Sequence, residues 1–434
     1  MDRMTKFLFV ISLDGLSTLD FEYISQLPNF KTLLNSASYS KKVYSVYPSL
    51  TYPAHASIVT GKYPKNHGII NNTLLLPNMK SPDWYWFRHQ IKCQTFYDLA
   101  IDNGMKVAAL LWPVTAKSRI QYNMPEIFAN RHWQNQTLVS LLNGSPIYQY
   151  KLDKEFGYLR DRLKQPNLDN FTHQSLLYTI KHKRPDLTLV HYTDLDTIRH
   201  QHGFHSREAK QALERHDSRI GDIVDALKAN GIYEDSTIVI LGDHSSLDEN
   251  KIINLNVLLK ENGYIRTNRN GFIKSYKAIV KNCDGSAYLY VKNNDPELIT
   301  QIYNLINDFN RQHNCIESIF SQSSAIELGA DPECALMLEA STGFYFQDKV
   351  EGKIIEEIPN ELDANLFHYT KSTHGYSPFK IDYTTVFIAA GRGIKTGVII
   401  DEMNLVDEGP TMAKLLGVQL TDTDGRILHE LLVD

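Results

Sequence analysis

Acidic and histidine residues gather at the ends of three short apolar runs in this 434-residue chain. FLFVISL leads into Asp14, LTLVHY is followed by TDLDTIRH with Asp196 and His200, and TIVILG leads into Asp243 and His244. A single aspartate after a strand is usually a turn or a helix cap, but three strands with the same ending are harder to explain in that way. Carboxylate and imidazole ligands together suit zinc, with manganese or iron as alternatives.

The spacing within these segments suits metal binding. Asp196 and His200 are four residues apart, so one helical turn would place both side chains on the same face. Asp243 and His244 are adjacent and point in different directions from a strand end, so they could serve two neighbouring ions. Farther along the chain, STHGYSP offers another histidine, His374. Two nearby acids lack this spacing and are interpreted as caps or supporting groups: Asp194 and Asp248.

A candidate nucleophile lies in the segment VYPSLTYPAHASIVTGKYPKNHGIINN, residues 46–72. Pro53 suits the first turn of a helix that continues through Ala56–Thr60, and Gly61 is a typical helix stop. Thr51 then lies at the amino end of that helix, where backbone N–H groups and the helix dipole favour an anion. A metal-bound hydroxyl in that field would ionise more readily and could attack phosphorus. The alternative is that Thr51 only caps the helix.

The elements that must position these side chains indicate an α/β fold. Short apolar runs predict buried parallel strands at Phe7–Leu13, Val107–Leu111, Leu187–Tyr192, Thr237–Leu241 and Thr385–Ala390. Amphipathic stretches predict helices, among them Ala209–Ala229 and Gln301–Phe309. Strands that alternate with helices are typical of a mostly parallel sheet, whose ligands bind beyond the carboxyl ends of the strands. Residues 255–368 break the alternation with β-like runs at Ala287–Val291 and Gly343–Gln347, and we interpret them as an insertion or cap within one domain of residues 1–434.

Composition gives no sign of nucleic-acid or membrane binding. The formal net charge is −5 and the pI about 6.3, without the basic excess of a nucleic-acid binder. No stretch of the sequence reaches the roughly 20 apolar residues of a membrane helix. The apolar run after MDRMTK is too short for a signal peptide, and the four cysteines form no CxxC pair. We therefore expect free thiols and a cytoplasmic location; the oligomeric state is open.

The segment TYPAHASIVTGKYPKNHGIINN resembles the nucleophile motif of the type I phosphodiesterase / nucleotide pyrophosphatase family, a branch of the alkaline phosphatase superfamily. That motif runs threonine, an aromatic residue, proline, asparagine, histidine, then IVTG, tyrosine-proline, HGI and an asparagine. VISLDG, DTIRH, GDH and STHGY are similar to the other family landmarks and follow in the same order. The resemblance covers landmarks from residue 8 to 428 and implies an alkaline-phosphatase-like three-layer fold.

Carried over by position, the resemblance implies two divalent metal ions, most simply zinc. One ion would be held by four residues: Asp14, Thr51, Asp243 and His244. The other would be held by three: Asp196, His200 and His374. Thr51 would be the nucleophile and form a covalent phospho-threonine. Asn72 would donate a hydrogen bond to a non-bridging phosphate oxygen, and Tyr52 would stack on a nucleotide base.

Three features depart from the family pattern. Ala54 stands where the family usually has asparagine, and GDHSS, beginning at Gly242, replaces the usual SDHGM. The chain also shows no secretory signal, whereas the familiar eukaryotic members act outside the cell. The first two differences leave the predicted metal ligands intact, but they weaken any inference about the specific substrate.

These motifs predict a metal-dependent hydrolase of small phosphate esters that cleaves phosphodiester or pyrophosphate bonds, in particular those of nucleotide-like or aryl diesters. Few cations near the motifs could hold the extra charge of a monoester; the candidates are Lys62, Lys65 and Arg199. A phosphomonoesterase or phosphonate hydrolase with the same two-metal site is the main alternative, and a metal-binding pseudoenzyme is a lesser one. A sulfatase would need a C/S-x-P-x-R motif at the nucleophile, which is absent there.

Overall fold

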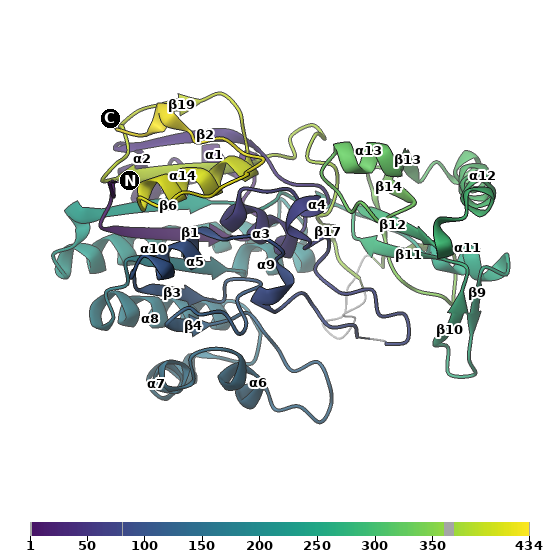
Figure 1. The fold of residues 1–434 in the computed structure, drawn as a ribbon, viewed down its shortest axis with the longest axis horizontal. Coiled ribbons are helices and arrows are strands. Elements are labelled where there is room, and N and C mark those ends of the chain that lie inside the picture. The colour runs from purple at the N-terminus through teal and green to yellow at the C-terminus, as the bar shows by residue number, and fades with distance from the viewer. Residues whose placement is uncertain (1, 80, 360–368, 434) are drawn as a thin grey trace.

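The computed structural model describes residues 2–79, 81–359 and 369–433. A nine-stranded sheet lies at the centre of its main part, in the order β19-β2-β18-β6-β1-β5-β3-β4, with β20 beside β2 (Figure 1). The inner strands are β18 (Thr385–Gly391), β6 (Ser236–Leu241), β1 (Phe7–Leu13) and β5 (Leu187–Tyr192). The outer strands are β19 (Ile399–Ile400), β20 (Met403–Asn404), β2 (Ala37–Tyr44), β3 (Val107–Leu110) and β4 (Tyr122–Met124).

The sheet is mostly parallel, as predicted. β1 pairs in parallel with both β5 and β6, but β18 is antiparallel to β6 and to β2. The prediction that Thr385–Ala390 forms a parallel strand is therefore wrong in direction, because an apolar run indicates burial on both faces and not strand direction. The chain leaves β6 at the carboxyl edge of the sheet and comes back to that edge, so β18 must run the opposite way.

Helices cover both faces of the sheet, and the alternating side chains of β1 show how. Leu8 and Val10 belong to one core, which they share with α3 (Thr51–Thr60), α5 (Phe96–Asp102) and α14 (Glu408–Leu415). Phe7, Phe9 and Ile11 belong to the other, which they share with α2 (Pro28–Leu34), α8 (Asn167–His182) and α10 (Arg207–Ala229). Successive strand residues point to opposite faces, so the main part has three layers.

A second part follows β6, and its elements from residue 251 to 357 are called the cap below (Figure 1). Its four-stranded antiparallel sheet consists of β11 (Ala278–Cys283), β12 (Ser286–Val291), β14 (Leu336–Ala340) and β13 (Ile316–Ser321). This sheet shares a separate core with α11 (Leu255–Glu261) and α12 (Pro296–His313). A smaller sheet joins β8 (Lys251–Ile253), β15 (Phe344–Phe346) and β16 (Ile355–Glu357). Residues 360–368 of the predicted insertion lie outside the described residues.

The remaining elements connect these parts or extend their edges. Both predicted helices lie inside longer ones, α10 and α12. Additional helices are α1 (Phe21–Ile24), α4 (Pro64–His67), α6 (Gln136–Asn143), α7 (Pro146–Phe156), α9 (Asp194–His202) and α13 (Gln322–Glu327). Additional strands are β7 (Leu247–Asp248), β9 (Ile265–Thr267), β10 (Ile273–Tyr276) and β17 (Ser372–Thr373).

Candidate active site

Thr51 is the first residue of α3, and the N-cap position belongs to Leu50, whose backbone is extended. Pro53 lies in the first turn, and Gly61 ends the helix at φ 67, a left-handed conformation that suits glycine. The Thr51 hydroxyl makes no capping bond; its Oγ1 lies 3.1 Å from Nε2 of His244. The interpretation of Thr51 as only a cap is therefore not supported, and its hydroxyl faces the predicted metal ligands.

The first group of predicted ligands lies at the carboxyl ends of β1 and β6. Nε2 of His244 is 3.3 Å from Oδ1 of Asp14 and 3.2 Å from Oδ2 of Asp243. One ligand atom from each of these three residues lies within 4.8 Å of the others. The backbone N–H of Gly15 donates to Oδ1 of Asp243 at 3.0 Å, which fixes the orientation of that carboxylate.

The second group comes from α9 and from the loop that follows β17. Nε2 of His200 is 3.1 Å from Oδ2 of Asp196, as expected for two residues four positions apart on a helix. His374 stacks on His244 with ring centroids 4.0 Å apart and lies 5.2 Å from the ring of His200. Asp196, His374 and His244 also bring ligand atoms within 4.8 Å of one another, so His244 stands between the two groups.

The chemistry of this cluster fits bound cations. Within the described residues, Oδ1 of Asp14, Oδ1 of Asp196 and Oδ2 of Asp243 are buried without a hydrogen-bond partner, and so is Nδ1 of His374. Burial, together with the neighbouring carboxylates of Asp243 and Asp196, raises the pKa of Asp14 to about 8. Burial likewise raises the pKa of Asp243 to about 7. Divalent ions would satisfy these orphaned atoms and relieve the repulsion.

Two further buried histidines support the cluster, and the sequence analysis did not single them out. His55 lies one turn after Thr51, with Nδ1 2.7 Å from the carbonyl oxygen of Thr51. Nε2 of His191 is 3.1 Å from Oδ2 of Asp14, and its Nδ1 is 3.3 Å from Glu126. Burial alone would lower the pKa of His191, but hydrogen bonds to the two carboxylates raise it well above its usual value. His55 lies in the predicted helix segment TYPAHAS and His191 in the predicted strand LTLVHY, and in both segments the sequence analysis considered other residues for the site.

Asn72 and Tyr52 differ in how they meet the site. The amide oxygen of Asn72 accepts from the backbone N–H of Tyr52 at 2.9 Å, which leaves the amide NH₂ free to donate toward the adjoining pocket. Tyr52 itself is 0% exposed and packs in the core beneath α3. The prediction that Tyr52 stacks on a base is wrong in this structure, because successive helix residues point about 100° apart and Thr51 takes the direction of the site. Trp84, which packs edge-on against Tyr52 at 5.1 Å, lines the pocket instead.

The three basic side chains considered for binding a monoester have partners elsewhere. Lys62 pairs with Asp422 at 2.7 Å, and Nζ of Lys65 donates to the carbonyl oxygen of Ile326 at 2.9 Å. Arg199 is 1% exposed and pairs with Asp20 at 2.6 Å. The two acids interpreted as supporting groups also have structural partners: Asp194 bonds to Arg215 and Arg219, and Asp248 accepts from the backbone N–H of Phe204.

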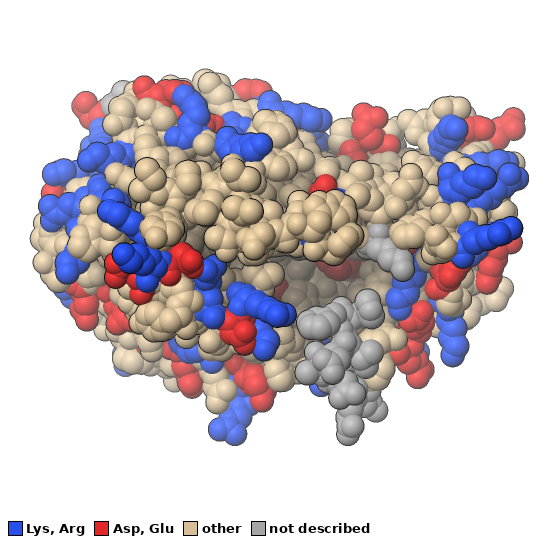
Figure 2. All heavy atoms as spheres, turned by 90° about the horizontal axis from the view of Figure 1, so that it is seen from below, with Lys and Arg blue, Asp and Glu red and all other residues tan. Residues whose placement is uncertain are grey.

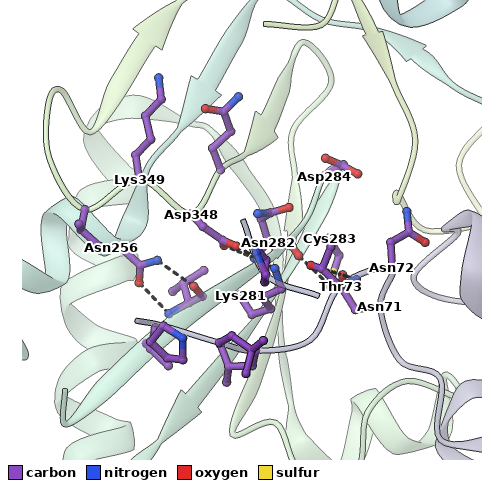
Figure 3. A pocket seen from close by; sticks show the side chains of 18 of the residues that line it. Asn71, Asn72, Thr73, Asn256, Lys281, Asn282, Cys283, Asp284, Asp348 and Lys349 are labelled. Atoms are coloured by element: carbon purple, nitrogen blue, oxygen red, sulfur yellow. Dashed lines mark hydrogen bonds and ion pairs between the residues drawn. The ribbon is translucent and has the colours of Figure 1, made fainter. Parts of the chain in front are cut away.

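A pocket of about 960 Å³ adjoins the cluster and lies between the main part and the cap. Figure 2 shows a hollow between the two parts on this face of the molecule. Leu50, Asn72, His200 and His374 line the end near the reactive groups, and cap residues line the rest. Figure 3 shows Asn72 and Asp284 toward one end of the pocket, with Asn256 and Lys349 toward the other. This volume is sufficient for a substrate much larger than phosphate.

Comparison with known proteins identifies the family. The sequence profile described as type I phosphodiesterase / nucleotide pyrophosphatase matches residues 8–389. The chain belongs to this family. It is 26% identical over 252 residues to human ectonucleotide pyrophosphatase/phosphodiesterase family member 1, and the match covers 54% of this chain but 23% of that relative. It is 22% identical over 449 residues to the bis(5'-adenosyl)-triphosphatase ENPP4 of Pongo abelii, covering 98% of this chain and 82% of the relative. These relatives are enzymes, and the first spans far more sequence than this chain matches.

Solved structures confirm the fold. Murine ectonucleotide pyrophosphatase/phosphodiesterase 5 superimposes with a TM-score of 0.68 at 16% sequence identity, covering 98% of this chain and 100% of that one. An inactive variant of the same murine protein, solved in complex with AMP, gives the same TM-score over 99% of this chain. The alkaline-phosphatase-like fold predicted from the motifs is therefore confirmed.

Two observations bear on the compartment and the membrane. All four cysteines are free, and Cys283, Cys315 and Cys334 are buried. Throughout the described residues, no helix combines the length and apolar character needed to cross a bilayer. The cytoplasmic location stays a prediction.

Proposed function

We propose that this chain hydrolyses phosphodiester or pyrophosphate bonds of small phosphate esters in two steps, with Thr51 as the nucleophile. The observation that carries the proposal is the position of the Thr51 hydroxyl: it stands at the first turn of α3, 3.1 Å from His244, among carboxylate and imidazole groups with orphaned buried atoms. Membership of the family and the names of the relatives support the same reaction class.

The reaction needs an oxygen that can attack phosphorus and a place for the charge of the phosphoryl group. The positive end of the helix dipole at the amino end of α3 favours negative charge beside Thr51. In the first step the bond between Thr51 Oγ1 and phosphorus forms while the bond to the leaving oxygen breaks. In the second step water attacks the phospho-threonine and the Thr51 hydroxyl is restored.

Two divalent ions would fit the buried carboxylates and imidazoles around Thr51. Asp14, Asp243, His244 and Thr51 would hold one ion, and Asp196, His200 and His374 the other. When bound, such ions supply Lewis-acid stabilisation of the attacking and leaving oxygens, and zinc suits this donor set best. Asn72 is placed to donate its amide NH₂ to a non-bridging phosphate oxygen, because its amide oxygen is held by the backbone.

The residues beneath the cluster keep these groups in position. The bond from His55 to the Thr51 carbonyl ties the first turn of α3 to the end of β1, because the other nitrogen of His55 bonds to Ser12 at 2.9 Å. His191 orients Asp14 and is itself held by Glu126. Supporting bonds of this kind fix the direction of metal-binding side chains.

Two experiments test the proposal. Purified, metal-loaded protein should turn over bis(p-nitrophenyl) phosphate. Acid quenching during turnover should yield, by mass spectrometry, a Thr51 peptide that carries the phosphoryl group with its remaining p-nitrophenyl ester. A diester turned over without any Thr51 peptide that carries this adduct, in wild type and in slowed variants alike, would show direct hydrolysis by water. Failure to turn over any of a panel of diesters, monoesters and phosphonates while holding two ions would instead indicate a metal-binding pseudoenzyme.

A further inference from the structure

A carboxylate of the cap faces the reactive groups from across the pocket. Asp284 lies at the tip of the hairpin between β11 and β12, in the left-handed conformation at φ 59. Its Oδ2 is 3.9 Å from Nδ1 of His374, and its side chain is 33% exposed. The carboxylate therefore stands beside the second group of ligands and remains open to the pocket (Figure 3).

The hairpin tip is held in this place by the loop that carries His374. The backbone N–H of Gly285 donates to the carbonyl oxygen of His374 at 2.8 Å, and a Cβ at Gly375 would lie 1.8 Å from the carbonyl oxygen of Cys283. The backbone of Asp284 also accepts from the N–H of Phe346 at 2.7 Å. The position of Asp284 relative to His374 is thus fixed by close backbone packing.

Every other charged side chain of the cap that lines the pocket has an opposite charge beside it. Lys281 lies 2.8 Å from Asp348, and Lys349 lies 2.7 Å from Glu356. Glu351 pairs with Lys260 at 2.9 Å. Within the described residues, no lysine or arginine lies within ion-pair distance of Asp284. Among the described residues, the pocket therefore offers no unpaired lysine or arginine to a substrate, and it offers one carboxylate that no lysine or arginine pairs with.

We propose that Asp284 is a specificity-determining residue that disfavours substrates with additional negative charge near the reacting phosphorus. It would repel phosphomonoester dianions and polyphosphate chains, and it would accept a hydrogen bond from a hydroxyl or amino group. The pocket then selects phosphodiesters whose second substituent is neutral or positively charged and carries polar hydrogens. This inference rests on the proposed function, because it concerns the choice among substrates of the Thr51 site.

The test removes the charge at constant shape. In metal-loaded Asp284→Asn, we expect kcat/KM for p-nitrophenyl phosphate, a dianion, to rise relative to kcat/KM for bis(p-nitrophenyl) phosphate, a monoanion. The shift in this ratio should be roughly tenfold, the size expected for removing one like charge a few ångströms away in a partly solvated pocket. The matched control is Glu351→Gln, which removes the same charge from the solvent edge of the pocket, where the side chain is 61% exposed; its ratio should change less than twofold.

Phosphate binding provides a readout that needs no turnover. Calorimetry of metal-loaded protein should show inorganic phosphate binding roughly tenfold tighter to Asp284→Asn than to the wild type or to Glu351→Gln. An unchanged ratio and unchanged phosphate affinity would overturn the inference, and so would loss of a bound ion in Asp284→Asn, which would make Asp284 a metal ligand. If wild-type protein turned over no ester, the proposed function would fail, whereas the phosphate comparison would still decide the role of Asp284.

Discussion

At the scale of single residues, the site depends on how one helix start meets two strand ends. The hydroxyl of Thr51 lies in the first turn of α3, and His244 enters from the end of β6 to within 3.1 Å of it. Asp14 approaches from the adjacent strand β1. Each of these side chains alone could be explained as a helix cap or a buried structural group. Such roles do not explain why all of them meet at one edge of the sheet.

Replacement of Thr51 tests the nucleophile most directly. Thr51→Ala should lower kcat for a chromogenic diester by at least roughly a thousandfold, because water must replace a positioned oxygen. Thr51→Ser should retain part of the activity, since it keeps the hydroxyl but loses the methyl group that fixes its rotamer. Steady-state kinetics with metal content verified in each variant would measure both. Turnover by Thr51→Ala at the parental rate would assign this residue a purely structural role.

Loss of a ligand should remove metal and activity together. Asp243→Ala deletes a fully buried carboxylate with one orphaned oxygen, so we expect the protein to hold at least one ion fewer and to lose turnover. Elemental analysis after dialysis, paired with the diester assay, measures both quantities. Chelation of the wild type should abolish activity, and added zinc should restore it. Full activity in a sample shown to be free of metal would contradict the two-ion proposal.

The aromatic side chain available to a planar substituent is Trp84. Trp84→Ala should raise KM for bis(p-nitrophenyl) phosphate roughly tenfold with a smaller effect on kcat, the size expected for loss of one stacking contact. Trp84→Phe should recover most of the difference. Tyr52→Leu serves as the comparison, because it removes the ring of Tyr52, which is buried against Trp84. A larger effect on KM from Tyr52→Leu than from Trp84→Ala would return the stacking role to Tyr52.

At the scale of elements, the ends of β6 and β18 show how a departure from the family pattern is accommodated. Gly242 stands between β6 and the ligand Asp243, where the family usually has serine. A Cβ at this position would lie 2.0 Å from Oγ1 of Thr385 and 2.3 Å from the carbonyl oxygen of Leu16. Thr385, at the start of β18, donates to that same carbonyl at 2.5 Å. The threonine hydroxyl occupies the space into which a side chain at position 242 would project.

Gly242→Ala should therefore disturb the metal site through the strand end. We expect a loss of about 1–3 kcal/mol or more in the free energy of unfolding, as for other overpacked positions, and weaker metal binding because Asp243 and His244 must move. Denaturant unfolding and metal titration would measure the two effects. Gly242→Ala combined with Thr385→Ala should recover only part of the loss, since the Leu16 carbonyl still blocks the site. Complete recovery of stability and metal binding would show that Thr385 alone excludes a side chain at position 242.

At the scale of the whole molecule, Glu339 connects the cap to the main part. This residue of β14 accepts from the hydroxyl of Tyr47, which precedes α3, and from the backbone N–H of Ser377, which follows His374. Lys380 lies 3.2 Å from it. Burial raises the pKa of the Glu339 carboxyl from its ordinary value of 4.5 to about 7. One buried side chain thus joins the segments on both sides of the site to the cap sheet.

This raised pKa predicts a particular dependence of stability on pH. Between pH 4.5 and about pH 7 the folded protein keeps a proton on Glu339 that the unfolded chain has released. The contribution of Glu339 to the free energy of unfolding is therefore fully present below pH 4.5 and is lost as pH rises to about 7. In Glu339→Gln the free energy of unfolding should fall by roughly 2–3 kcal/mol less between pH 5 and pH 8 than in the wild type, since each pKa unit corresponds to about 1.4 kcal/mol. Urea unfolding of metal-loaded protein at pH 5 and pH 8 measures the difference. Glu317→Gln, which removes an exposed partner of the same Lys380, should keep the wild-type slope; an equal change in both variants would refute the assignment.

The sequence by itself determined the strands of the sheet core and the residues that meet at its carboxyl edge. Both follow from local rules: an apolar run of six or seven residues between polar segments predicts a buried strand, and ligands of a parallel sheet follow the strand ends. Pro53 and Gly61 mark the limits of α3 for equally local reasons. Strand ends pointed to Asp14, Asp243 and His244, and the family resemblance completed the set of seven predicted metal ligands; the structure brings all of them together.

Tertiary structure alone decided which way the other side chains and strands point. Tyr52 is buried because α3 has one rotational position on the sheet, which the sequence near Thr51 does not specify. Trp84 lines the pocket from a later segment that pairs with Thr73. β18 is antiparallel because the chain returns from the cap to the edge that it left. Asp284 meets His374, and His191 meets Glu126, across long stretches of intervening chain. Contacts of that kind depend on long-range packing, and no local spacing in a single sequence encodes them.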